Sequence, residues 1–211
     1  HYDGQVSWDA TLEPSSLHGV TTVVSGNCGV GFAPVRPGTE QWLIELMEGV
    51  EDIPGTALAE GLTWQWENFP QYLDAIEKRE LAVDYGTQIA HGAVRGYAMG
   101  ERGANNEEAT EDDIKAMARI VQEGIEAGAL GFSTSRTEAH RAVDGQAVPG
   151  TYAAEAELFG LGRAMAAGGQ AVFEVAPQGT AGESPADACM REMDWMAKLS
   201  DDIDRPVSFT L

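Results

Sequence analysis

Residues 20–34 read VTTVVSGNCGVGFAP, and this stretch indicates the fold class. Its β-branched run predicts a strand buried on both faces, as in parallel sheets. Glycines follow the run at once, and they allow the backbone to turn sharply past the end of the strand. Cys28, in the middle of that turn, is therefore expected at the carboxyl end of a parallel strand, where such folds collect their functional side chains.

Further strand-like runs recur along the chain, separated by segments with helix signals. Asn68 and Thr110 are typical N-cap residues, Ser184-Pro185 is a typical helix start, and Gly168 ends a helix that begins near Ala153. Alternating strands and helices predict parallel β/α units, whose right-handed crossovers bring the carboxyl ends of all strands to one edge. A doubly wound sheet and a (β/α)8 barrel both fit this α/β pattern. The predicted strands are residues 20–26, 83–91, 129–135, 171–176 and 206–211.

The segment 38–68 interrupts this alternation. It contains a predicted helix at 39–50, and a connection of this length is typical of a lid or a substrate pocket. His1 opens a polar segment with no strand ahead of it, and the chain stops inside the predicted strand 206–211. We therefore expect an internal piece of a longer protein, with one more strand ahead of His1. The isolated piece is expected to be inactive and to associate, because its sheet edges are unpaired.

The chain is strongly acidic, with 34 Asp and Glu against 13 Lys and Arg and a formal net charge of -21. This balance argues against nucleic acid and anionic membranes as partners, because both need basic side chains. No apolar run approaches the ~18 residues of a membrane span. Two cysteines make no disulfide framework, and Cys189 falls with Met193 and Met196 on one apolar stripe of its predicted helix. A reducing, cytoplasmic setting is the simplest expectation.

Several short motifs follow one another along the chain. They read HYDGQ at 1–5, GVTTVV at 19–24, GNCGVGFAP at 26–34, MEGVEDIP at 47–54, WQWENF at 64–69, HGAVR at 91–95 and GALGFST at 128–134. Together they resemble the N-acyl-D-amino-acid deacylases (D-aminoacylases) of the amidohydrolase superfamily, closely over residues 1–135 and loosely beyond. The resemblance implies that residues 1–211 form a partial metal-dependent (β/α)8 TIM barrel, roughly its strands 1–6, with a lid-like excursion at 38–68.

The resemblance also implies a metal site. His1 matches the second histidine of the family's His-X-His motif, and Cys28 matches its cysteine ligand. The family carries further metal-binding histidines on its fifth and sixth strands, but residues 172–177 and 207–211 contain none, which marks a divergent member. Glu174 is a candidate for a further ligand, because a buried carboxylate at a strand end needs a cation or a donor. The implied cofactor is zinc, as one or two ions, and the family's catalytic aspartate would follow the end of this chain.

By the same resemblance, the chain belongs to a hydrolase of linear amide bonds, with metal-bound hydroxide attacking the acyl carbon. His91, at a predicted strand end, is the candidate to contact substrate or stabilise the reacting oxygen. Arg136 and His140 are candidates to bind a substrate carboxylate, and Trp64 is a candidate to line an acyl pocket. The expected partner is a small N-acyl amino acid or a related amide, and the oligomeric state is not indicated.

Other interpretations stay open. The superfamily also includes deaminases and enzymes that hydrolyse cyclic amides, and the chain could belong to either kind. Cys28 could instead be a nucleophile with His91 as its base, or a packed thiol in a tight turn. A non-catalytic homologue could bind a small anion through the backbone N–H groups of residues 26–31.

Overall fold

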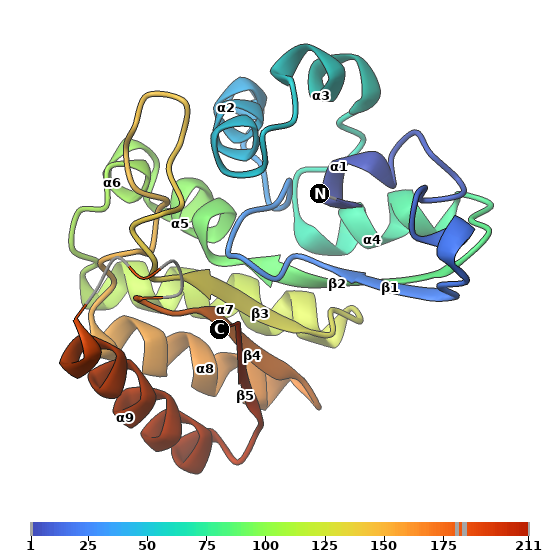
Figure 1. The fold of residues 1–211 in the computed structure, drawn as a ribbon. Coiled ribbons are helices and arrows are strands. Elements are labelled where there is room, and N and C mark those ends of the chain that lie inside the picture. The colour runs from blue at the N-terminus through green and yellow to red at the C-terminus, as the bar shows by residue number, and fades with distance from the viewer. Residues whose placement is uncertain (1, 180–181, 183–184, 211) are drawn as a thin grey trace.

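The computed structural model describes residues 2–179, 182 and 185–210, and within them five parallel strands form one sheet (Figure 1). The strands follow one another in chain order, from β1 to β5. A doubly wound sheet reverses its order at one point, so the consecutive order favours the barrel interpretation, and the sheet curls into a half-barrel. The strands are β1 (Thr22–Ser25), β2 (Asp84–Ala90), β3 (Gly131–Ser135), β4 (Val172–Ala176) and β5 (Val207–Phe209).

Helices connect the strands. In Figure 1, α7, α8 and α9 lie along β3, β4 and β5, and α2 and α3 lie at the top of the view, above β1 and β2. The excursion predicted at 38–68 contains α2, which buries an apolar face, followed by α3. No helix among the described residues is both long and apolar enough to cross a bilayer. The helices are α1 (Tyr2–Gln5), a 3-10 turn η1 (Ser16–His18), α2 (Glu40–Glu51), α3 (Gly55–Gly61), α4 (Phe69–Glu77), α5 (His91–Met99), α6 (Glu101–Ala104), α7 (Glu111–Glu126), α8 (Glu155–Gly168) and α9 (Ala186–Ile203).

The predicted helix starts have the expected capping chemistry. Thr110 Oγ1 accepts from the Asp113 N–H at 3.2 Å, and the Asp113 carboxylate accepts in return from the Thr110 N–H at 2.9 Å. Asn68 makes the same kind of reciprocal cap at the start of α4. These caps satisfy backbone donors that have no partner within the helix. Helix α9 follows Pro185 as predicted, and the proposed start residue Ser184 lies outside the described residues.

One predicted helix face is wrong in part. Met196 of α9 is buried, but Met193 is 44% exposed. The buried face instead includes Glu192, whose carboxylate pairs with Arg136 at 3.2 Å. An apolar pattern alone does not predict a buried glutamate, because the partner that satisfies it is on a distant loop.

One face of the sheet packs against the helices and forms the core. The other face is directed toward the barrel interior. Phe132 of β3 packs on Phe173 of β4, with ring centroids 5.2 Å apart, and Phe173 packs on Trp195 of α9. Side chains alternate along a strand. Ser133 and Glu174, which are paired in register, therefore face the inner side of the half-barrel, where a barrel collects polar groups near its strand ends.

Candidate metal site at the end of β1

Cys28 lies in a tight turn directly after β1, as the sequence predicts. Gly26 and Gly29 both adopt positive φ angles, 81° and 74°, and a side chain at Gly29 would come within 2.6 Å of the β3 backbone. The Gly29 N–H donates to Ser133 Oγ at 3.0 Å. The Gly29 carbonyl accepts from the Gly92 N–H, in the first turn of α5, at 2.9 Å. Contacts with β3 and with the helix that follows β2 therefore fix the turn that carries Cys28.

Replacing Ser133 with alanine is expected to lower the free energy of unfolding by about 1–3 kcal/mol, because the buried Gly29 N–H would lose its acceptor. Urea denaturation followed by circular dichroism measures the change. The matched control is Thr56→Ala, which removes a hydroxyl from an exposed position on α3. Equal unfolding midpoints for the two variants would show that the Ser133 hydroxyl does not hold the turn.

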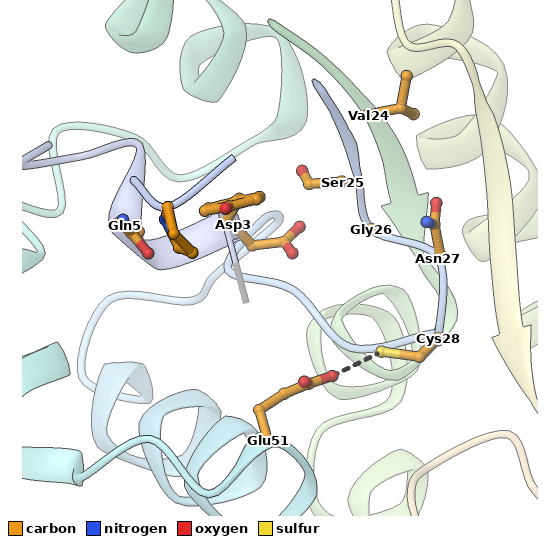
Figure 2. A pocket seen from close by; sticks show the side chains of 10 residues that line it. Asp3, Gln5, Val24, Ser25, Gly26, Asn27, Cys28 and Glu51 are labelled. Atoms are coloured by element: carbon orange, nitrogen blue, oxygen red, sulfur yellow. Dashed lines mark hydrogen bonds between the residues drawn. The ribbon is translucent and has the colours of Figure 1, made fainter. Parts of the chain in front are cut away.

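A cavity of about 460 Å³ opens beside this turn (Figure 2). Its wall comes from α1, from the end of β1 and from Glu51 at the end of α2. The Cys28 thiol donates to Glu51 Oε1 at 3.4 Å. Figure 2 shows the Asp3 carboxylate on the opposite wall, directed toward Ser25. One thiol and two carboxylates thus line the same space.

The cavity is electrostatically unfavourable for a negative sulfur. Burial raises the pKa of the Cys28 thiol to about 12, and the negative charges of Glu51 and Asp3 add to the effect, against the Val30 N–H that favours the thiolate. Burial also raises the pKa of Asp3, although hydrogen bonds with the Ser25 side chain and the backbone oppose that shift. A cation in the cavity would reverse this balance, because opposite charge favours the ionised form of each group.

The donor chemistry of the cavity fits a divalent cation. Thiolate sulfur and carboxylate oxygen are both ligands that zinc accepts, and Cys28 and Glu51 already lie in contact. No three His, Cys, Asp or Glu side chains come close enough to hold a metal ion within the described part of the chain. Cys28 and Glu51 would therefore hold such an ion together with ligands from elsewhere. His1, the implied histidine ligand, lies outside the described residues.

His91 begins α5 directly after β2 and is fully buried. Its Nδ1 lies 2.8 Å from Thr134 Oγ1, and its Nε2 lies 2.9 Å from Glu157 Oε1 on α8. Glu157 also pairs with the buried guanidinium of Arg95. Burial lowers the pKa of His91, the hydrogen bond and negative charge of Glu157 oppose that shift, and the positive charge of Arg95 adds to it. Both ring nitrogens of His91 are engaged in this network, and its ring does not line the Cys28 cavity.

Arg136 and His140 follow β3, as predicted, but they are bound within the fold. Arg136 pairs with Glu192 on α9 and donates to the Ala153 carbonyl at 2.8 Å. His140 Nδ1 lies 2.9 Å from Ser135 Oγ. Both side chains therefore already have polar partners within the fold, and neither lines the cavity beside Cys28.

The remaining candidates, Trp64 and Glu174, also do not line the Cys28 cavity. Trp64 packs on Phe32 and Trp66, with ring centroids 5.7 and 5.6 Å away, and it lines a separate hollow. Glu174 is half-buried on β4 and does not form a three-residue metal-binding cluster with Cys28 within the described residues. The structure thus brings Cys28 together with Glu51, which the sequence reasoning did not select as a site residue.

Glu51 stands out in the sequence only as part of a motif that supports the family resemblance. It lies in the motif MEGVEDIP at 47–54, and it ends a helix that was predicted to stop one residue earlier. Ser133 lies in the motif GALGFST at 128–134, but nothing in that motif indicates its contact with Gly29, and Glu157 lies in none of the motifs. Their roles depend on contacts with Gly29 and His91, distant in the chain.

The half-barrel and the site at its strand end are typical of metal-dependent hydrolases, and the sequence profile of the amidohydrolase family matches residues 1–210. The chain belongs to the amidohydrolase family. Its relatives include the D-aminoacylase of Alcaligenes xylosoxydans xylosoxydans, 30% identical over 134 residues, which cover 64% of this chain and 25% of that protein. The N-acyl-D-glutamate deacylase of the same organism is 30% identical over 159 residues, which cover 75% of this chain and 28% of that protein. The chain thus spans about a quarter of the length of these relatives.

Solved structures show the same fold. A crystal structure of D-aminoacylase superposes with a TM-score of 0.71 at 23% identity, covering 99% of this chain and 38% of that one. The N-acyl-D-glutamate deacylase of Bordetella bronchiseptica, complexed with zinc and a phosphonate inhibitor, superposes with a TM-score of 0.62 at 23% identity, covering 92% and 34% of the two chains. These likenesses confirm the predicted partial barrel.

Proposed function

We propose that this chain is part of a metal-dependent hydrolase of linear amide bonds, with N-acyl-D-amino acids as its substrate class. The observation that carries the proposal is the position of Cys28, at the carboxyl end of β1 beside a carboxylate-lined cavity, in a member of the amidohydrolase family. The named activities of the D-aminoacylase, the N-acyl-D-glutamate deacylase and an N-acyl-D-aspartate deacylase among its relatives support the substrate class.

The residues of this chain would hold and shape the site. A zinc ion, when bound, supplies Lewis-acid chemistry that polarises an acyl carbonyl and acidifies water. Cys28 would bind the ion, and the turn anchored at Gly29 would orient its sulfur. The cavity of about 460 Å³ gives a small acyl amino acid room beside that sulfur. Further proposed ligands are His1 and Glu174. His91, Arg136, His140 and Trp64 do not line this cavity, so their contact with a substrate stays a prediction.

The alternative in which Cys28 acts as a nucleophile has less support. A nucleophilic cysteine needs a lowered pKa or an adjacent base, whereas the pKa of Cys28 is raised to about 12. His91, the base in that alternative, is held by Thr134 and Glu157. The raised pKa and the engaged ring of His91 therefore weigh against a nucleophilic Cys28 that uses His91 as its base.

The proposed function is tested by a substrate panel with the complete gene product. Zinc-loaded protein is expected to hydrolyse N-acetyl-D-amino acids faster than their L enantiomers, to lose this activity on treatment with a chelator, and to regain it when zinc is added. Release of the free amino acid measures each rate. Zinc-loaded protein that releases no amino acid from either enantiomer would contradict the proposal, and activity that survives chelation would contradict its metal dependence.

A further inference from the structure

Glu51 reaches the Cys28 cavity from a helix and not from a barrel strand. It is the last residue of α2, and the following Asp52 adopts a left-handed conformation with φ 54°, donating its N–H to the Glu48 carbonyl at 3.1 Å. Glu48 Oε1 in turn accepts from the Gly55 N–H at 2.9 Å. The end of α2 is thus held on both sides of Glu51.

Glu51 lies on the buried face of the same helix, one turn after Met47 and two turns after Ile44. Leu43, Ile44, Leu46 and Met47 of α2 are each no more than 3% exposed. Burial of such a stripe fixes the rotation of a helix against the core. The carboxylate of Glu51 is therefore presented to Cys28 by a packed element, although it belongs to the excursion at 38–68.

The distance between the two side chains matches a shared metal ion. A cysteine sulfur and a carboxylate oxygen bound to one tetrahedral zinc, at about 2.3 and 2.0–2.2 Å, lie about 3.5 Å apart. Cys28 Sγ and Glu51 Oε1 lie 3.4 Å apart. A zinc ion could join this pair with little change in the separation of the two atoms.

We infer that Glu51 is a ligand of the divalent cation that Cys28 binds, supplied by the excursion helix α2. The inference rests on the proposed function, since it assumes that Cys28 is a metal ligand, but it adds an oxygen donor that comes from a helix of the excursion and not from a strand. Over the described residues 172–176 and 207–209, β4 and β5 offer no histidine or cysteine. The site would therefore link metal binding to the position of α2, and the ion would hold the excursion against the end of β1.

The test compares zinc affinity among variants of the complete gene product, by competition with a chromophoric chelator. Glu51→Ala is expected to weaken zinc binding by at least about tenfold, which is the lower end of the loss caused by removing outer-shell partners. The matched control is Glu45→Ala, on the exposed face of the same helix, which should bind zinc like the wild type. Loss of affinity for Glu51→Ala alone supports the inference.

Cobalt(II) substitution gives a second readout that does not depend on activity. Glu51→Ala is expected to retain the sulfur-to-cobalt charge-transfer band from Cys28 and to change the visible bands that report the remaining ligands. Wild-type visible bands together with unchanged zinc affinity in Glu51→Ala would overturn the inference. If Glu51→Ala does not fold, Glu51→Gln keeps the size of the side chain and removes its charge, and the same loss of affinity and the same spectral change are expected.

The metal dependence and the assignment of Glu51 as a ligand can be contradicted separately. If Cys28→Ala abolishes zinc binding and Glu51→Ala leaves it unchanged, the assignment of Glu51 is wrong and the proposed metal dependence stands. If the wild-type protein binds no zinc, or Cys28→Ala binds it as tightly as the wild type, both the assignment and the metal dependence are wrong.

Discussion

Cys28→Ala is expected to lower the zinc affinity of the complete gene product by more than about 100-fold, beyond the 10–100-fold losses that follow changes outside the coordination sphere. The reason is that the variant removes the proposed sulfur ligand from a turn that two neighbouring segments hold in place. Hydrolysis of N-acyl-D-amino acids is expected to fall with the metal content. Zinc titration and amino acid release on the same preparations measure both effects.

Cys189 provides the control for this prediction. It is half-buried in α9 and does not line the Cys28 cavity, so Cys189→Ala should retain zinc and activity. Equal unfolding midpoints for the two variants would separate loss of metal from loss of fold. Full zinc occupancy in Cys28→Ala would exclude the sulfur of Cys28 as a necessary ligand.

The second large effect is expected from the buried network behind the strand ends. Glu157→Ala is expected to lower the free energy of unfolding by about 3–5 kcal/mol, because it leaves a buried charge without its partner. Arg95 is only 1% exposed and pairs with Glu157, and the same carboxylate contacts His91. Since whole domains are stable by about 5–15 kcal/mol, a loss of this size is visible as a large shift in the urea midpoint.

A surface ion pair serves as the control for Glu157. Arg163 and Asp202 join α8 to α9 at 2.7 Å, but the arginine side chain is 62% exposed. Exposed pairs contribute little because water screens them, so Asp202→Ala should leave the unfolding midpoint nearly unchanged. A Glu157→Ala midpoint close to that of Asp202→Ala would mean that the guanidinium of Arg95 finds water or another acceptor.

The sequence predicted the β/α alternation because local patterns carry it. The β-branched run at 20–24 and the caps at Asn68 and Thr110 depend on neighbours within a few residues, and the structure confirms the strand and both helix starts. The predicted burial of both faces of that strand is wrong, because burial alternates along β1 and Val24 is 43% exposed. The choice between a barrel and a doubly wound sheet depended on the family resemblance. Residue patterns alone left it open, because strand order is set by packing between elements far apart in the chain.

The candidate site was predicted less completely than the fold. Cys28 at a strand end follows from its flanking glycines, and the structure places it there. Its contact with Glu51 depends on how α2 packs, 23 residues further along the chain. His91 was predicted at a strand end, but its hydrogen bond with Glu157 depends on the packing of α8, which carries Glu157 66 residues further along the chain. Contacts of this kind have no local signature, so only the folded chain reveals them.

The measurement that tests the central claim most directly is X-ray absorption at the zinc edge of the complete wild-type protein. We predict one sulfur scatterer at about 2.3 Å with nitrogen or oxygen scatterers at about 2.0–2.2 Å, and loss of the sulfur contribution in Cys28→Ala. A zinc-loaded protein whose spectrum contains no sulfur scatterer would contradict it.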